Sequence, residues 1–198
     1  MKENTVILVG YLFSFAILLF SCAGTDLTQE QVDDAYKGKP VSDILVIAVT
    51  GNEHNRRSFE KKFVAHLKSV GTAAVASEEA VPMPGDLKLK KETILNAVDQ
   101  YKNDGVIITQ LVSKESEDFY TRGGRTRRGF FSYSHDPGYS STTTTVRLET
   151  NLYNANTGEL IWSGKSKTLS RGSTDQLMND VIKAVINNLQ KNKLIAPK

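Results

Sequence analysis

The chain of 198 residues carries 25 Lys and Arg against 22 Asp and Glu, which gives a formal net charge of +3. So small an excess of positive charge does not indicate a nucleic-acid-binding protein. Cys22 is the one cysteine in the sequence, which excludes an intramolecular disulfide and a zinc site made of several cysteines.

Residues 1–21 have the layout of a secretory signal peptide. A short charged start leads into an apolar run from Val6 to Phe20, and the small residue Ser21 stands directly before Cys22. The run is shorter than the about 20 apolar residues that a membrane-spanning helix needs. We therefore predict that residues 1–21 are a signal peptide and that Cys22 is the first residue of the mature protein.

The segment from Leu19 to Cys22 resembles the lipobox of bacterial lipoproteins, with Phe20 where that motif prefers a small or aliphatic residue. The resemblance implies a diacylglycerol on the Cys22 thiol and acylation of the new amino terminus, by palmitate or a similar fatty acid. Two or three acyl chains hold a protein stably on a bilayer, because each buried CH₂ contributes about 0.8 kcal/mol. The alternative is an uncleaved membrane anchor with an incidental cysteine.

Residues 22–40 are polar and show no apolar periodicity, so we expect a lipidated cysteine followed by a flexible tether. Residues 41–198 suit a single periplasmic α/β domain with one core.

A strand–helix–strand–helix–strand pattern opens this domain. The continuous aliphatic run over 43–50 predicts a strand buried on both faces. A helix capped by Asn55 follows, with its apolar residues on one face, and then a short strand over 72–76. A second helix over 90–103 and a buried strand over 106–112 complete the pattern. Right-handed crossovers would set the three strands parallel.

The remaining sequence predicts an antiparallel hairpin and a final helix. Residues 142–153 alternate between two faces, residues 154–158 supply turn chemistry, and a return strand runs over 160–169. The helix over 174–191 has a wide apolar face. The predicted fold class is α/β (α+β mixed): a three-strand parallel βαβαβ unit extended by an antiparallel hairpin, with a C-terminal amphipathic helix packed on the sheet.

This layout, the lipobox and the segment from Arg147 to Gly164 resemble small periplasmic α/β lipoproteins of the Gram-negative outer membrane. The group lies around the penicillin-binding-protein activator lipoprotein and the curli secretion lipoprotein. The resemblance implies an envelope assembly or interaction role without catalysis. Because Ala23 replaces the aspartate that retains enterobacterial lipoproteins at the inner membrane, we expect the periplasmic face of the outer membrane.

The stretch over 121–141 is unusually long for a connection between two strands, and such loops are either functional or disordered. Arginines can form bidentate contacts with phosphate or carboxylate, and aromatic side chains supply contact area at interfaces. We predict a loop that binds an envelope protein or an anionic envelope component; the alternative is a solvated glycine-rich loop without a ligand. Its candidate residues are Arg122, Arg125, Arg127, Arg128, Phe130, Phe131, Tyr133 and Tyr139.

The sequence carries little that indicates catalysis. The histidines His54, His66 and His135 have no metal-ligand spacing, so we expect no metal and no cofactor beyond the covalent lipid. His135 and Asp136 are adjacent, but no nucleophile signature accompanies them. We expect Trp162 to serve packing rather than ligand stacking.

The sequence thus predicts a lipid-anchored, non-catalytic binding or assembly factor of a cell-envelope complex, in contact with the membrane but not with nucleic acid. Two alternatives remain. The first is an oligomeric subunit of a secretion or transport complex. The second is an envelope-polymer hydrolase that uses His135 and Asp136.

Overall fold

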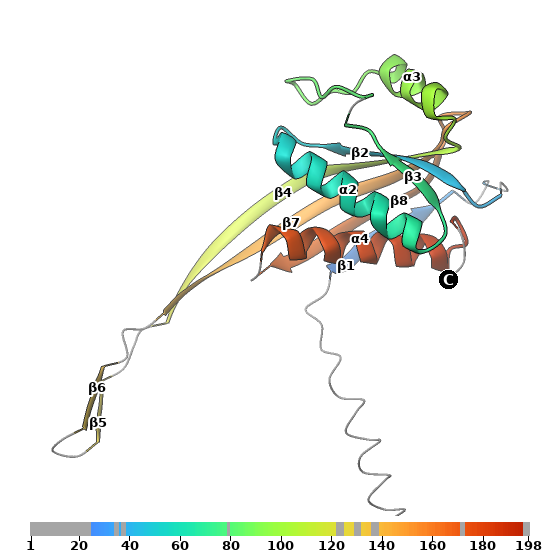
Figure 1. Cartoon of the computed structure of the whole chain (residues 1–198). Coiled ribbons are helices and arrows are strands. Elements are labelled where there is room, and N and C mark those ends of the chain that lie inside the picture. Colours follow the sequence, from blue (N-terminus) through green and yellow to red (C-terminus); the bar gives the residue numbers. More distant parts are fainter. Residues whose placement is uncertain are drawn as a thin grey trace, which may run out of the picture.

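The computed structural model describes residues 25–33, 36, 39–78, 80–121, 125–128, 132–135, 139–170 and 173–195. Cys22, Arg122, Phe130, Phe131 and Asp136 lie outside these residues. Among the described residues, six strands form one mixed sheet in the order β1-β8-β7-β4-β2-β3 (Figure 1). Their bounds are β1 Thr25–Val32, β2 Asp43–Val49, β3 Ala73–Ala76, β4 Gly105–Thr121, β7 Tyr139–Asn154 and β8 Leu160–Ser170.

The parallel unit that the sequence predicted is confirmed. Strand β2 pairs in parallel with both β3 and β4. Helix α2 (Glu53–Ser69) connects β2 to β3, and helix α3 (Lys91–Tyr101) lies between β3 and β4. The cap of α2 is Asn52 rather than the predicted Asn55: Asn52 has an extended backbone, and its side chain accepts a hydrogen bond of 2.9 Å from the Asn55 N–H.

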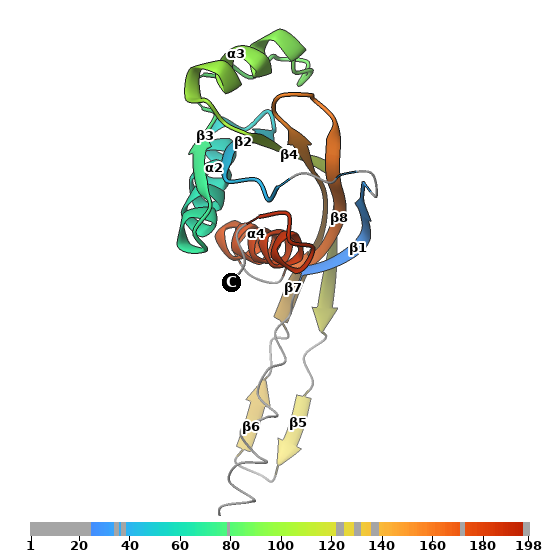
Figure 2. The ribbon, with the colours of Figure 1, turned by 90° about the vertical axis from the view of Figure 1, so that its right-hand side faces the viewer.

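Helices cover the sheet unequally. Helices α2 and α4 (Thr174–Lys191) pack on one face, which we call the helix face, and Figure 2 shows α4 inside the curve of β7, β8 and β1. The main core lies between the helix face and these two helices and includes Ile44, Phe63 and Val185. Helix α3 covers a smaller core on the opposite face of the sheet, which includes Leu45 and Ala97. Strand β2 therefore contributes alternate residues to two cores, which explains its continuous apolar sequence.

The antiparallel hairpin is also confirmed. Strands β7 and β8 pair from Thr144–Ser170 to Tyr153–Leu160, and Gly158 in the turn has a φ of 74°. Trp162 is fully buried, and its Nε1 donates a hydrogen bond of 3.0 Å to Asn188 Oδ1 on α4. Trp162 thus packs in the main core, as the sequence predicted.

The prediction of an unstructured tether is wrong for residues 25–32, which form β1 at an edge of the sheet. An irregularity between Leu27 and Gln29 shifts the register of β1 against β8. Because of this shift, Leu27 and Val32 both face the main core although they are five positions apart, an interval that would place them on opposite faces of a regular strand. The bulge hides the alternation by which a strand is recognised in sequence.

The prediction of a long loop over 121–141 also needs correction. Strand β4 continues to Thr121 and β7 begins at Tyr139, so the two strands predicted around the loop are longer than expected. Two short strands between them, β5 (Arg125–Arg128) and β6 (Ser132–His135), form a separate two-stranded sheet. The threonines of residues 142–145 favour strand structure, which helps to extend the pairing.

Gly164 is required where Trp162 lies against the sheet. A Cβ added at Gly164 would meet the buried Trp162 ring, at 2.5 Å from Cζ2. We expect Gly164→Ala to lower the free energy of unfolding by about 1–3 kcal/mol, because the ring must move within a packed core. Chemical denaturation measures the loss. Gly51→Ala is the control, since nothing lies within 4 Å of its added Cβ, and a similar loss in both variants would contradict this account.

Candidate functional site

The most distinctive feature of the structure is a two-stranded ribbon that leaves the sheet. The last pair between β2 and β4 is Val49–Gln110, and the last pair between β7 and β8 is Thr144–Ser170. Beyond these points β4 and β7 pair only with each other among the described strands, up to Thr121–Tyr139. Figure 1 shows this extension pointing away from the body of the domain. We call residues 117–121 and 139–143 the ribbon.

A bulge marks the base of the ribbon. The register of β4 against β7 shifts between Leu111 and Ser113, so Val112 is an extra residue. A bulge bends its strand and increases the local twist, which turns the ribbon away from the sheet. Leu111 and Val112 are 51% and 54% exposed, an unusual pair of solvent-facing apolar side chains.

A cross-strand ion pair stiffens the same base. Arg147 on β7 donates from Nη1 to Glu115 Oε1 at 2.6 Å and to Ser113 Oγ at 3.1 Å, both on β4. These groups are partly exposed, so their contribution to stability is at most about 1 kcal/mol. They fix the relative position of β4 and β7 beyond the last β2–β4 pair, where Arg147 still pairs with Lys167 on β8.

The tip of the ribbon brings predicted binding residues together on paired backbone. In β5 and β6, Arg127 lies opposite Tyr133 and Arg125 opposite His135, while Arg128 lies opposite Ser132. Tyr139 opens β7. The predicted binding residues in described backbone therefore stand on three strands rather than in a loop. Arg122, Phe130 and Phe131 lie outside the described residues.

The chain enters the sheet at the same end. Thr25, the first residue of β1, pairs with Thr168 on β8, and their hydroxyl oxygens are 2.7 Å apart. Thr168 pairs in turn with Val146, which pairs with Lys114 just beyond the bulge. The start of β1 is therefore level with the base of the ribbon. Cys22 precedes Thr25 by three positions and lies outside the described residues.

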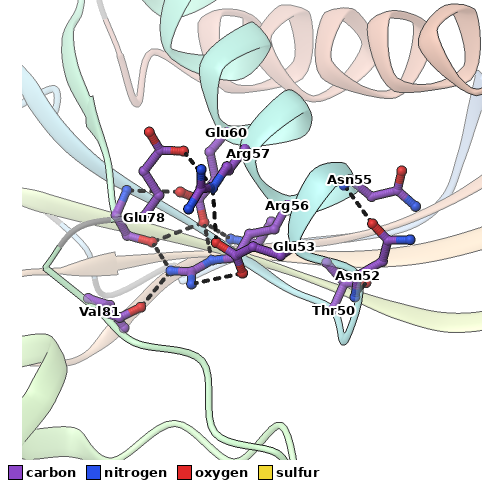
Figure 3. Close-up of polar contacts among 11 residues, drawn as sticks. Thr50, Asn52, Glu53, Asn55, Arg56, Arg57, Glu60, Glu78 and Val81 are labelled. Atoms are coloured by element: carbon purple, nitrogen blue, oxygen red, sulfur yellow. Dashed lines mark hydrogen bonds and ion pairs between the residues drawn. The ribbon is translucent and has the colours of Figure 1, made fainter.

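A buried polar cluster that the sequence analysis did not predict lies between α2, β2 and the end of β3. Arg56 and Glu60 are 1% and 0% exposed and are joined from Nε to Oε1 at 3.0 Å (Figure 3). Arg56 also donates to Ser77 Oγ and the Val81 carbonyl, and Glu60 accepts from the Ala48 and Ser77 N–H groups. All these partners are internal, so the cluster stabilises the fold. Its signal was two charged residues on the apolar face of α2 around Phe59.

Catalytic and metal chemistry receives no support from the described residues. They contain no group of three or more His, Cys, Asp and Glu side chains that could hold a metal ion. Burial raises the pKa of Tyr36 and of Tyr153, and the hydrogen bond from Lys102 lowers the pKa of Asp99. These three groups lie on separate parts of the fold. No helix within the described ranges is long and apolar enough to cross a membrane.

No protein family model matches the chain, and no curated protein matches its sequence. Among solved structures, a PelC dodecamer from Paraburkholderia phytofirmans is similar, with a TM-score of 0.50 and 11% identity over 88% of this chain and 99% of that chain. Lipoprotein GNA1162 from Neisseria meningitidis has a TM-score of 0.42 and 16% identity over 76% and 99%. A minor lipoprotein from Acinetobacter baumannii has 0.30 and 8% over 78% and 96%. The similarity to PelC shows a shared fold.

Proposed function

We propose that this protein is a non-catalytic, lipid-anchored subunit of a cell-envelope assembly, and that the ribbon and its β5–β6 tip make the assembly contact. The observation that carries the proposal is the ribbon itself, whose strands continue well past the last pair with the rest of the sheet. The fold shared with a protein that forms a dodecamer supports a role in assembly.

The ribbon suits a protein contact for two reasons. Outside the body of the sheet, its outer strand edges are unpaired among the described strands, and unpaired N–H and C=O groups are available to another chain. Its tip also combines Arg125, Arg127 and Arg128 with Tyr133, and arginine and tyrosine are enriched among residues that dominate binding energy. Acidic or phosphorylated envelope components fit the same arginines.

A lipid anchor would determine where in the cell envelope this contact is made. A lipid on Cys22 would hold the chain three residues before β1, at the end of the sheet from which the ribbon leaves. The anchored protein would then present its ribbon near the membrane surface, on the periplasmic face of the outer membrane. Intact mass of the membrane-extracted protein tests the anchor: an unmodified Cys22 thiol would rule it out.

Self-association is a specific form of the same proposal. The PelC structure is a dodecamer, so further copies of this chain are the first candidates for the partner. The envelope-polymer hydrolase is not proposed, because no observation on the described residues favours it.

Replacing Arg122, Arg125, Arg127 and Arg128 with serine tests the contact. We expect at least a fivefold loss of partners recovered in a pull-down from membranes, because several charge-assisted contacts are removed. The melting temperature should change little, since surface substitutions usually shift stability by less than about 0.5 kcal/mol.

The matched control replaces four exposed lysines elsewhere, Lys68, Lys88, Lys90 and Lys91, with serine. It removes the same charge from the chain but leaves the ribbon intact, so recovery should stay at the native level. Equal recovery in all three proteins would show that the ribbon tip does not carry the contact.

A further inference from the structure

A cavity of about 240 Å³ opens on the helix face at the base of the ribbon. It lies where β2 ends, between the first turns of α2 and α4 and the strands β4 and β7. In open α/β sheets, ligands bind outside the carboxyl ends of parallel strands. Strand β2 has its carboxyl end at this cavity, whereas β4 runs past the cavity and continues to Thr121. None of the described residues that line the cavity belongs to β5 or β6.

The walls of the cavity are formed by side chains at one end of the main core. Ala48, Phe59 and Met178 line it and are at most 6% exposed. Leu148 and Leu177 line it as well, and both are partly buried against the same core. An apolar group placed here would cover these five side chains and continue the core outward, which is favourable because apolar surface leaves water.

The size of the cavity limits that group. A cavity of about 150 Å³ lined by apolar side chains accepts benzene. A space of about 240 Å³ accordingly holds a chain of about ten carbon atoms. A single medium-length acyl chain fits, whereas a diacyl lipid does not.

The rim determines the charge of the ligand. Of the described residues that line the cavity, Lys114 is the only charged one, and no acidic side chain stands among them. Lys114 is exposed and makes no ion pair with another described residue. A carboxylate at the rim would therefore lie close to the positive charge of Lys114 and would not be repelled by an acidic side chain among the described lining residues.

We propose that this cavity binds a single-chain carboxylate, a medium-chain fatty acid, with its aliphatic tail between Phe59, Leu148 and Met178 and its carboxylate beside Lys114. The proposal goes beyond the assembly role and does not depend on it. A ligand here would touch α2, α4 and both strands at the base of the ribbon.

Isothermal titration of the folded protein with a series of fatty acids from butanoate to tetradecanoate tests the tail. The affinity should rise about fourfold for each added methylene, as burial of a CH₂ group predicts, and should level off at about ten carbons, where the cavity is full. A rise that continues without a limit through tetradecanoate would indicate nonspecific surface binding and would overturn the proposal, as would an absence of binding throughout.

Comparison of decanoate with decanol and decyltrimethylammonium tests the head group. Decanoate should bind most tightly and decyltrimethylammonium least tightly. Lys114→Gln should lower the affinity for decanoate by about two- to fivefold, the range of an exposed ion pair, and leave the affinity for decanol unchanged. Lys165→Gln on β8, which does not line the cavity, is the control and should bind like the native protein. Equal affinities for all three head groups would overturn the anionic assignment.

Two variants that fill the cavity locate the site. Thr144→Phe and Ala48→Leu both add volume to residues that line it, one at the partly exposed rim and one in the buried wall. Each should weaken the binding of decanoate at least tenfold. Because Thr144 is only partly buried, Thr144→Phe still tests the site if Ala48→Leu unfolds the protein. Unchanged binding in a folded Thr144→Phe variant would place the ligand elsewhere and refute the proposal.

Discussion

Glu60→Ala is expected to lower the free energy of unfolding by about 3–5 kcal/mol, because removal of one partner leaves the other charge buried and unpaired. Glu60 is fully buried and accepts hydrogen bonds from Arg56, from the Ser77 hydroxyl and from the backbone N–H groups of Ala48 and Ser77. Its loss would remove the buried carboxylate 3.0 Å from the Arg56 guanidinium and leave only the half-exposed Glu53 carboxylate, at 3.8 Å, as an ion-pair partner. It would also leave the Ala48 and Ser77 N–H groups without their acceptor. Urea denaturation followed by circular dichroism measures the effect.

An exposed acid on the same helix provides the control. Glu53 is 50% exposed and pairs with Arg57 at 3.2 Å and, at the longer distance of 3.8 Å, with Arg56, so Glu53→Ala should cost less than about 1 kcal/mol. If Glu60→Ala cost no more than Glu53→Ala, the cluster around Arg56 would not be the buried anchor between α2, β2 and the end of β3 that its hydrogen bonds indicate.

Removal of β1 is expected to cost about 2–4 kcal/mol, judged from the apolar burial that it contributes. Leu27 and Val32 pack against the main core, and Val32 lies opposite the buried Trp162. Asn188, which holds the Trp162 indole, also donates a hydrogen bond to Glu30 on β1. A chain that starts at Pro40 would expose this side of the core and leave β8 as an unprotected edge.

Thermal unfolding of chains that begin at Ala23 and at Pro40 measures this effect. The shorter chain should still unfold cooperatively, because most of both cores lies after Pro40, but at a clearly lower temperature. Equal melting temperatures would show that residues 23–39 act as a tether after all and that the pairing of β1 with β8 contributes nothing.

Much of the fold could be predicted because local and tertiary signals agree. The aliphatic run of β2 needs burial on both faces, and α2 and α3 supply it. The β7–β8 turn has Gly158 where positive φ is required, and α4 has a wide apolar face that covers the sheet. In each of these elements the pattern of apolar residues matches the surface that the structure buries.

The missed features depend on partners distant in the sequence. The bulge in β1 conceals which of its residues face the core, and only pairing with β8 reveals it. The ribbon depends on the pairing of β4 with β7 up to Thr121–Tyr139, which joins residues that are distant in the sequence. Arg56 and Glu60 look like a solvent-exposed i,i+4 pair until Ser77 and Val81 are brought over them. The cavity is formed by five elements, so no single segment of the sequence predicts it.

Chemical cross-linking in intact membranes tests the central claim most directly. The native chain is compared with a variant in which an Asn-Gly turn replaces residues 117–143, joining the cross-strand partners Ser116 and Thr144. The residues described in the two buried clusters all lie outside that segment, so we expect the variant to keep its fold and its membrane location. We expect the native chain to give cross-linked products of higher mass and the shortened chain to give none. The same products from both proteins would contradict an assembly contact through the ribbon.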